Sequence, residues 1–89
     1  MLKINKNKAE RLYNEGKTIY IVPCKVYPDF NNPWVKPFPI DLEKVKTEYE
    51  GYPDLIELHG NFKSRIANFE YYNCNSELGN YTHFYIDEA

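Results

Sequence analysis

The chain has 89 residues, which is enough for a single domain covering residues 1–89 and too short for two. Its mean hydropathy is -0.69 and no apolar run nears the roughly 18 residues of a membrane helix, so no membrane span is expected. The lysines near the N-terminus are not followed by an apolar stretch, so we expect no secretory signal and a cytoplasmic location. Aromatic residues make up 17% of the chain, which predicts a core rich in rings.

The net charge is only -2, but the charges are unevenly distributed along the sequence. Residues 1–46 carry nine Lys and Arg against five Asp and Glu, which gives +4. Residues 47–89 carry two against eight, which gives -6. Such a division is typical of a nucleic-acid-binding arm or of an acidic interaction face, although sequence halves interleave in a folded domain and their charges can cancel.

A short amphipathic helix is predicted over residues 8–15. Asn7 followed by Glu10 fits a capping box at its start, and Gly16 supplies a stop after its last turn. The next segment, residues 18–22, is a continuous run of β-branched and aromatic residues. Because both of its alternating faces are apolar, it predicts a central strand that is covered on both sides.

Prolines dominate the stretch from residue 26 to residue 40. They fix φ and remove backbone donors, so most of this stretch is expected to be extended or turning, with an edge strand at residues 34–38. Because the prolines restrict the backbone, the loop from 27 to 37 also loses less conformational entropy when it binds a partner. We therefore predict that it presents Phe30 or Trp34 to a protein partner.

Residues 41–50 fit either a helix or a strand. Apolar side chains recur at helical spacing, at Leu42, Val45 and Tyr49. Residues 45–50, in contrast, alternate strictly between apolar and polar, and we favour the strand. The turn residues at 51–54 and the apolar run at 55–58 then predict a β-hairpin.

The main helix is predicted over residues 62–74, with Asn61 as its N-cap. Residues 81–86 are aromatic and β-branched and follow a Gly-Asn turn, which predicts a terminal strand. Together these elements predict an α+β fold with two helices packed on a small, mainly antiparallel sheet of three to five strands.

No catalytic or cofactor motif is found in the sequence. The four glycines are too scattered for a phosphate-binding loop, and the acidic pairs lie in polar surroundings. Cys24, His59, Cys74 and His83 have the composition of a zinc site, or of a Cys-His catalytic pair, but no two are spaced as zinc ligands usually are. We therefore expect a protein that is not an enzyme and that carries no cofactor or metal.

The charged residues are consistent with two kinds of partner, a protein or a nucleic acid. A protein partner is favoured, bound by acidic side chains together with the aromatic loop. The candidate acidic contacts are Glu48, Glu50, Asp54, Glu57 and Glu70. Nucleic acid is the alternative, bound by Lys3, Lys6, Lys8 and Arg11 with tyrosines as stacking platforms, but a pI near 5.6 argues against it.

Three stretches, Leu12 to Cys24, Asn32 to Trp34 and Tyr71 to Gly79, resemble parts of small accessory proteins encoded by phages, plasmids and conjugative elements of Gram-positive bacteria. The resemblance covers roughly residues 8–40 and 62–86 and leaves 41–58 as a variable insertion. Some proteins of this sort are anti-CRISPR or other anti-defence inhibitors. The resemblance therefore implies a protein-binding module of a mobile genetic element whose partner is a host defence effector, such as a nuclease. It supplies no site residues.

Overall fold

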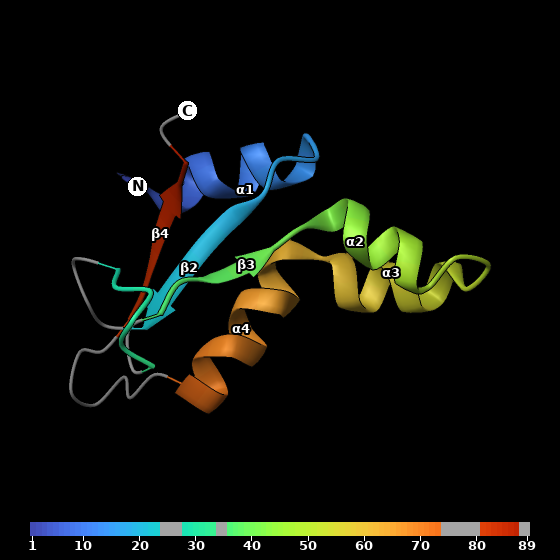
Figure 1. Cartoon of the computed structure of the whole chain (residues 1–89). Coiled ribbons are helices and arrows are strands. Elements are labelled where there is room, and N and C mark those ends of the chain that lie inside the picture. The colour runs from blue at the N-terminus through green and yellow to red at the C-terminus, as the bar shows by residue number, and fades with distance from the viewer. Residues whose placement is uncertain (24–27, 34–35, 74–80, 88–89) are drawn as a thin grey trace.

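The computed structural model describes residues 1–23, 28–33, 36–73 and 81–87 (Figure 1). Four helices and four strands follow one another along these residues. Their order is β1 (Leu2–Ile4), α1 (Lys6–Asn14), β2 (Ile19–Pro23), β3 (Phe38–Ile40), α2 (Leu42–Glu48), α3 (Pro53–Gly60), α4 (Phe62–Asn73) and β4 (Thr82–Ile86). The strands form one antiparallel sheet in the order β1-β4-β2-β3, which confirms the predicted α+β fold.

The strand register separates the side chains into two faces. Ile4, Phe84 and Ile21 lie opposite one another across three strands, and the next residues in register are Lys3, Tyr85 and Tyr20 on the other face. The first face packs against α1 and α4. On the second face Val22 and Tyr85 are also buried. The central strand β2 is therefore covered on both sides, as its sequence predicts.

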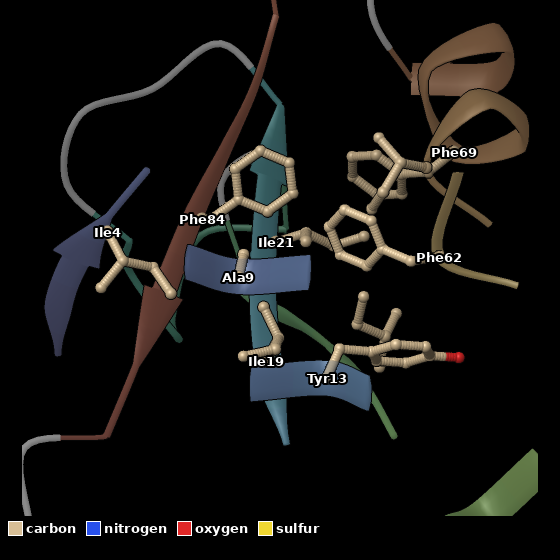
Figure 2. Packing of buried hydrophobic residues seen from close by; sticks show 10 residues of the cluster. Ile4, Ala9, Tyr13, Ile19, Ile21, Phe62, Phe69 and Phe84 are labelled. Carbon is tan, nitrogen blue, oxygen red and sulfur yellow. The ribbon is translucent and has the colours of Figure 1, made fainter. Parts of the chain in front are cut away.

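The core lies between the sheet and helices α1 and α4 (Figure 2). Tyr13 from α1 packs on Phe62 from α4 with ring centroids 5.6 Å apart, and Phe62 also contacts Phe84 of β4 at 5.8 Å. These aromatic contacts join the two helices to the sheet. The buried cluster consists of Ile4, Ala9, Tyr13, Ile19, Ile21, Ile40, Phe62, Ile66, Phe69 and Phe84.

Both helices predicted from periodicity are present. Helix α1 ends as predicted, because Gly16 adopts a φ of +92° and the backbone N–H of Lys17 donates to the Leu12 carbonyl at 3.0 Å, which closes a Schellman turn. Helix α4 begins as predicted, since the Asn61 side chain accepts a hydrogen bond from the Ser64 N–H at 3.1 Å.

Helix α1 and the edge strand have other boundaries than the sequence predicts. The N-cap of α1 is Asn5, whose side chain accepts from the Lys8 N–H at 2.8 Å, and not Asn7. Asn5 comes directly after strand β1, which the sequence analysis does not predict. The edge strand β3 covers Phe38–Ile40 and not residues 34–38, of which 34 and 35 lie outside the described residues.

The predicted hairpin at 45–58 is wrong, because this stretch forms two short helices, α2 and α3. Asp41 caps the first, and Pro53 occupies the first position of the second, where its missing N–H costs nothing. Gly51, with a φ of +88°, lies in the turn between them. None of the helices in the described ranges has the length and apolar character needed to cross a membrane.

Candidate protein-binding surface

Helices α2 and α3 form an antiparallel pair, residues 42–60, that projects from one end of the sheet and is called the arm below (Figure 1). Its first helix is fixed to the sheet through Asp41. The Asp41 carboxylate accepts hydrogen bonds from the Glu43 N–H at 2.9 Å and, less well, from the Lys44 N–H at 3.4 Å. Its second oxygen accepts from the Thr18 hydroxyl, beside β2, at 3.1 Å. One side chain thus caps α2 and ties it to the core layer.

The second helix is fixed at its last residue, Gly60. A methyl group added there would lie 2.9 Å from Leu42 Cδ1, the flexible end of that side chain, and 3.5 Å from Val45 Cγ1, so α3 approaches α2 closely at this residue and leaves no room for a larger side chain. The Tyr13 hydroxyl, buried beneath the arm, donates to the Gly60 carbonyl at 2.7 Å. Burial raises the pKa of Tyr13, an effect that Arg65 opposes and Asp41 reinforces. The base of the arm is therefore tightly connected to the core.

Beyond this base the arm has little core of its own. Helix α2 buries no residue and α3 buries only Gly60. Tyr49 and His59 stack across the pair with centroids 4.8 Å apart and planes within 13° of parallel. Helices of seven and eight residues are unstable in isolation, so the arm depends on the Asp41 cap of α2, its base and this stack.

Large apolar side chains remain exposed along α3 and the turn before it. Tyr52 is 64% exposed, Leu58 is 59% exposed and Leu55 is 36% exposed. In a surface helix such residues normally face a core, and here the described residues leave them uncovered. The three residues lie three positions apart in the sequence, which places them toward one side of the helix, and exposed apolar side chains gathered in this way typically mark a binding site for another macromolecule.

Four of the five predicted acidic contact residues lie on this arm. Glu48, Glu50, Asp54 and Glu57 are all exposed, near its tip and along α3. The arm carries five carboxylates against two lysines, a net charge of -3, and it holds four of the eight acidic residues of the second sequence half. The fifth residue, Glu70, is half-buried on α4 and lies elsewhere.

A groove of about 660 Å³ runs between the arm, β3 and α4. Phe38, Val45, Tyr49 and Leu58 provide its apolar lining. The Arg65 guanidinium of α4 lies 5.0 Å from the centre of the Phe38 ring, within the range of a cation–π contact. Glu48 lines the same groove from α2. Of the three exposed apolar residues on and before α3, Leu58 lines this groove, together with Lys44 and Glu48 from α2 and Arg65 from α4.

Glu70 lines a second, smaller groove of about 500 Å³ beside β1 and β4. Two of the four predicted basic residues, Lys3 and Lys6, lie here with Tyr81 and His83. The other two, Lys8 and Arg11, are exposed on α1. Burial lowers the pKa of His83, and the nearby charge of Lys3 lowers it further. This groove is mixed in charge, because Glu70 opposes the two lysines.

Phe30 lines neither of these grooves. Phe30 is 58% exposed after Asp29, whose side chain accepts from the Asn31 N–H at 2.9 Å in a tight turn. Trp34 lies outside the described residues, as do Cys24 and Cys74 of the weighed zinc site. The two histidines line different grooves, and within the described ranges no three His, Cys, Asp or Glu side chains gather as metal ligands.

Sequence reasoning missed the apolar part of this surface. The sequence predicts a strand at Leu55 and Leu58, and the contact between Phe38 and Arg65 joins residues far apart in the sequence. The helical spacing at Leu42, Val45 and Tyr49, together with Asp41 and Pro53 at the two helix starts, is the signal that points to the arm. No known family matches this chain, and no curated protein or solved structure is significantly similar to it, so the candidate surface rests on the geometry of the chain itself.

Proposed function

We propose that this chain is a non-enzymatic, cytoplasmic protein-binding module that contacts its partner through the α2–α3 arm. The observation that carries the proposal is the exposure of Tyr52, Leu55 and Leu58 on a projecting helical pair that is also acidic. Tyrosine at the centre of an interface often carries a large share of the binding energy, and apolar neighbours exclude water around it. The partner surface is accordingly apolar at its centre and basic around it.

The sequence resemblance adds the class of partner to this proposal. Inhibitors of bacterial defence effectors are found among the mobile-element proteins that three stretches of the chain resemble. A defence nuclease needs a basic channel for nucleic acid, and such a channel complements a protruding acidic arm. On this proposal Glu48, Glu50, Asp54 and Glu57 occupy places where the nuclease binds phosphates, and the chain inhibits by competition.

The arm can be tested by reversing its charge and comparing a matched reversal elsewhere. The arm variant is Glu48→Lys with Glu57→Lys, and the control is Glu10→Lys with Glu15→Lys on and after α1. Each protein is immobilised and used to capture partners from a Gram-positive bacterial lysate, and captured proteins are quantified. We expect a protein retained by wild type and control and lost from the arm variant. Equal capture by all three proteins would refute the proposal.

A second candidate function, nucleic-acid binding, is favoured by the groove beside β1 and β4. Lys3 and Lys6 could neutralise phosphates there while Tyr81, 57% exposed, stacks on a base. Glu70 in the same groove weakens this candidate by repelling phosphate. A salt-titrated binding assay with single-stranded oligonucleotides distinguishes the two functions. Binding that falls steeply with salt and is lost in Lys3→Gln with Lys6→Gln would favour nucleic acid over the arm.

A further inference from the structure

The sheet has two edge strands, and their outer backbone edges differ in hydrogen-bonding capacity. Strand β3 pairs only with β2, and β1 pairs only with β4. Pro39 is the central residue of β3 and Pro37 precedes the strand, and a proline has no backbone N–H to donate. Strand β1 consists of Leu2, Lys3 and Ile4, each of which has a backbone N–H. In the part of the sheet that the structure describes, β1 therefore has the outer edge with which an added strand can pair more fully.

This edge is accessible, held in place and separate from the arm. The N-terminus lies beside β4, and β3 and the arm lie across the sheet from it (Figure 1). Leu2 is 48% exposed and Lys3 is also exposed, so solvent reaches the strand. Ile4, in contrast, is buried in the core cluster and anchors β1 to the sheet. The backbone of β1 is thus already in the extended conformation that strand pairing requires.

The side chains of β1 determine which strand fits on this edge. Side chains directly opposite each other on neighbouring strands lie on the same face of a sheet. Leu2 and Ile4 belong to the face that packs against α1 and α4, and Lys3 belongs to the other face. A strand paired with β1 therefore places apolar side chains beside Leu2 and Ile4 and its central side chain beside Lys3.

Lys3 carries a charge at the centre of this edge that the described carboxylates leave unpaired. Within the described ranges Lys3 forms no ion pair. Asp87 follows β4, and its carboxylate accepts from the Tyr20 hydroxyl of β2, on the side away from β1. Glu70 lines the groove beside β1 but comes from α4, which covers the opposite face of the sheet. An acidic side chain opposite Lys3 would complement its charge, and a basic one would be repelled.

The same charge disfavours a second copy of this chain as the occupant. Two β1 strands can pair antiparallel about a two-fold axis with Leu2 opposite Ile4, and this register places the two Lys3 side chains directly opposite each other. Like charges in this position destabilise a strand pair, and lysine on an edge strand commonly prevents self-association. The occupant that fits is therefore a strand of another protein with the opposite charge at its centre.

We propose that the outer edge of β1 binds an extended segment of a partner protein in which one acidic residue is flanked by two apolar residues. The segment extends the sheet by one strand, with its carboxylate beside Lys3 and its apolar side chains beside Leu2 and Ile4. Because β1 has only three residues, it supplies few backbone hydrogen bonds, and the side-chain pairs decide which segments bind. This inference goes beyond the proposed function, since the edge and the arm are separate surfaces.

The experiment uses three labelled synthetic peptides of about ten residues, the length of a long strand, and the full chain. The first has a Val-Glu-Val centre flanked by Thr and Ser, the second has a Val-Lys-Val centre, and the third is the first methylated on its three central amide nitrogens. Binding is followed by fluorescence anisotropy and located by cross-strand NOEs. We expect saturable binding of the first peptide with NOEs to β1, about fivefold weaker binding of the second, and no binding of the third.

Two charge reversals provide the matched comparison. Lys3→Glu reverses the charge of the edge, and Lys63→Glu makes the same change in net charge at an exposed position of α4. We expect Lys3→Glu to prefer the Val-Lys-Val peptide and Lys63→Glu to keep the preference of the wild type for Val-Glu-Val. Both side chains are exposed, so both variants should fold, and thermal unfolding checks this.

The outcomes that contradict the inference are distinct. No binding of the Val-Glu-Val peptide, equal binding of its methylated form, or the same peptide preference in Lys3→Glu and Lys63→Glu would overturn the strand-binding edge. A wild-type dimer in sedimentation velocity that the Val-Glu-Val peptide dissociates would show that the edge pairs with a second copy, and would overturn the proposed occupant. The proposed function of the arm is tested separately, by charge reversal at Glu48 and Glu57.

Discussion

Asp41 links the arm to the sheet through both of its carboxylate oxygens. One caps α2 and the other accepts from the Thr18 hydroxyl at 3.1 Å. Since α2 has seven residues and buries none of them, its cap should account for much of its stability. We expect Asp41→Ala to destabilise the helix by about 0.5–2 kcal/mol, and hydrogen exchange of the α2 amides to accelerate before that of α4.

Asp41→Asn is the matched control for this prediction. Asparagine is as good an N-cap as aspartate, so this variant should keep α2 protected from exchange. If the Asn and Ala variants exchange equally fast, the carboxylate charge and not the cap holds α2 in place.

The Tyr13 hydroxyl connects helix α1 to the last residue of α3. Tyr13→Phe keeps the ring against Phe62 but removes the hydroxyl that donates to the Gly60 carbonyl at 2.7 Å. The carbonyl then loses its partner in a buried place, and we expect a loss of about 1–3 kcal/mol in the free energy of unfolding, measured by denaturant titration. Tyr20→Phe is the control, because the Tyr20 hydroxyl donates to Asp87 at the surface. Equal stabilities of the two variants would contradict this account.

At the scale of elements, the sequence predicts those parts that have long, regular patterns. Helices α1 and α4 and strands β2 and β4 all lie close to their predicted positions. The 41–58 stretch is different because its helices span only about two turns, too short for one periodicity to dominate. There, the alternation over 45–50 competes with helical spacing. The helical structure is held by contacts that no local pattern contains, between Asp41 and Thr18 and between Gly60 and Leu42.

Substitutions at Gly60 test whether close packing at the base sets the position of the arm. Gly60→Val would place a branched side chain against Leu42 and Val45, and overpacking of this kind typically costs about 1–3 kcal/mol. We expect a lower unfolding temperature and selective loss of exchange protection in α2 and α3. Gly60→Ala is the control, since its methyl group meets the flexible end of Leu42 and alanine favours the helix. An unaltered arm in Gly60→Val would show that the close approach is dispensable.

At the scale of the whole molecule, the candidate site was only partly predictable. Glu48, Glu50, Asp54 and Glu57 lie within ten residues of sequence, so any compact local structure brings them near one another. Glu70 belongs to another surface because α4 runs back along the sheet to a different groove. The groove beside the arm depends on strand order, since β3 must be the edge strand for Phe38 to meet both Arg65 and the arm.

His83 gives the whole molecule a pH dependence whose sign follows from its environment. Burial, and then the charge of Lys3, lower the pKa of His83 below its ordinary value of 6.5. Below that value the unfolded chain binds a proton more readily than the folded chain, so stability should fall as the pH falls from 6.5 through the folded-state pKa. Lys6 and Glu70 line the same groove and are the other charged groups beside it.

His83→Gln removes this titration and keeps a polar side chain of similar size. We expect the difference in denaturation midpoint between wild type and His83→Gln to be constant above about pH 7 and to shift in favour of the variant toward about pH 5. Lys3→Gln should give a smaller change in the same direction, because it removes only the second of the two causes. A midpoint difference that stays constant over this range would show that His83 accepts a proton as easily in the folded chain as in the unfolded one.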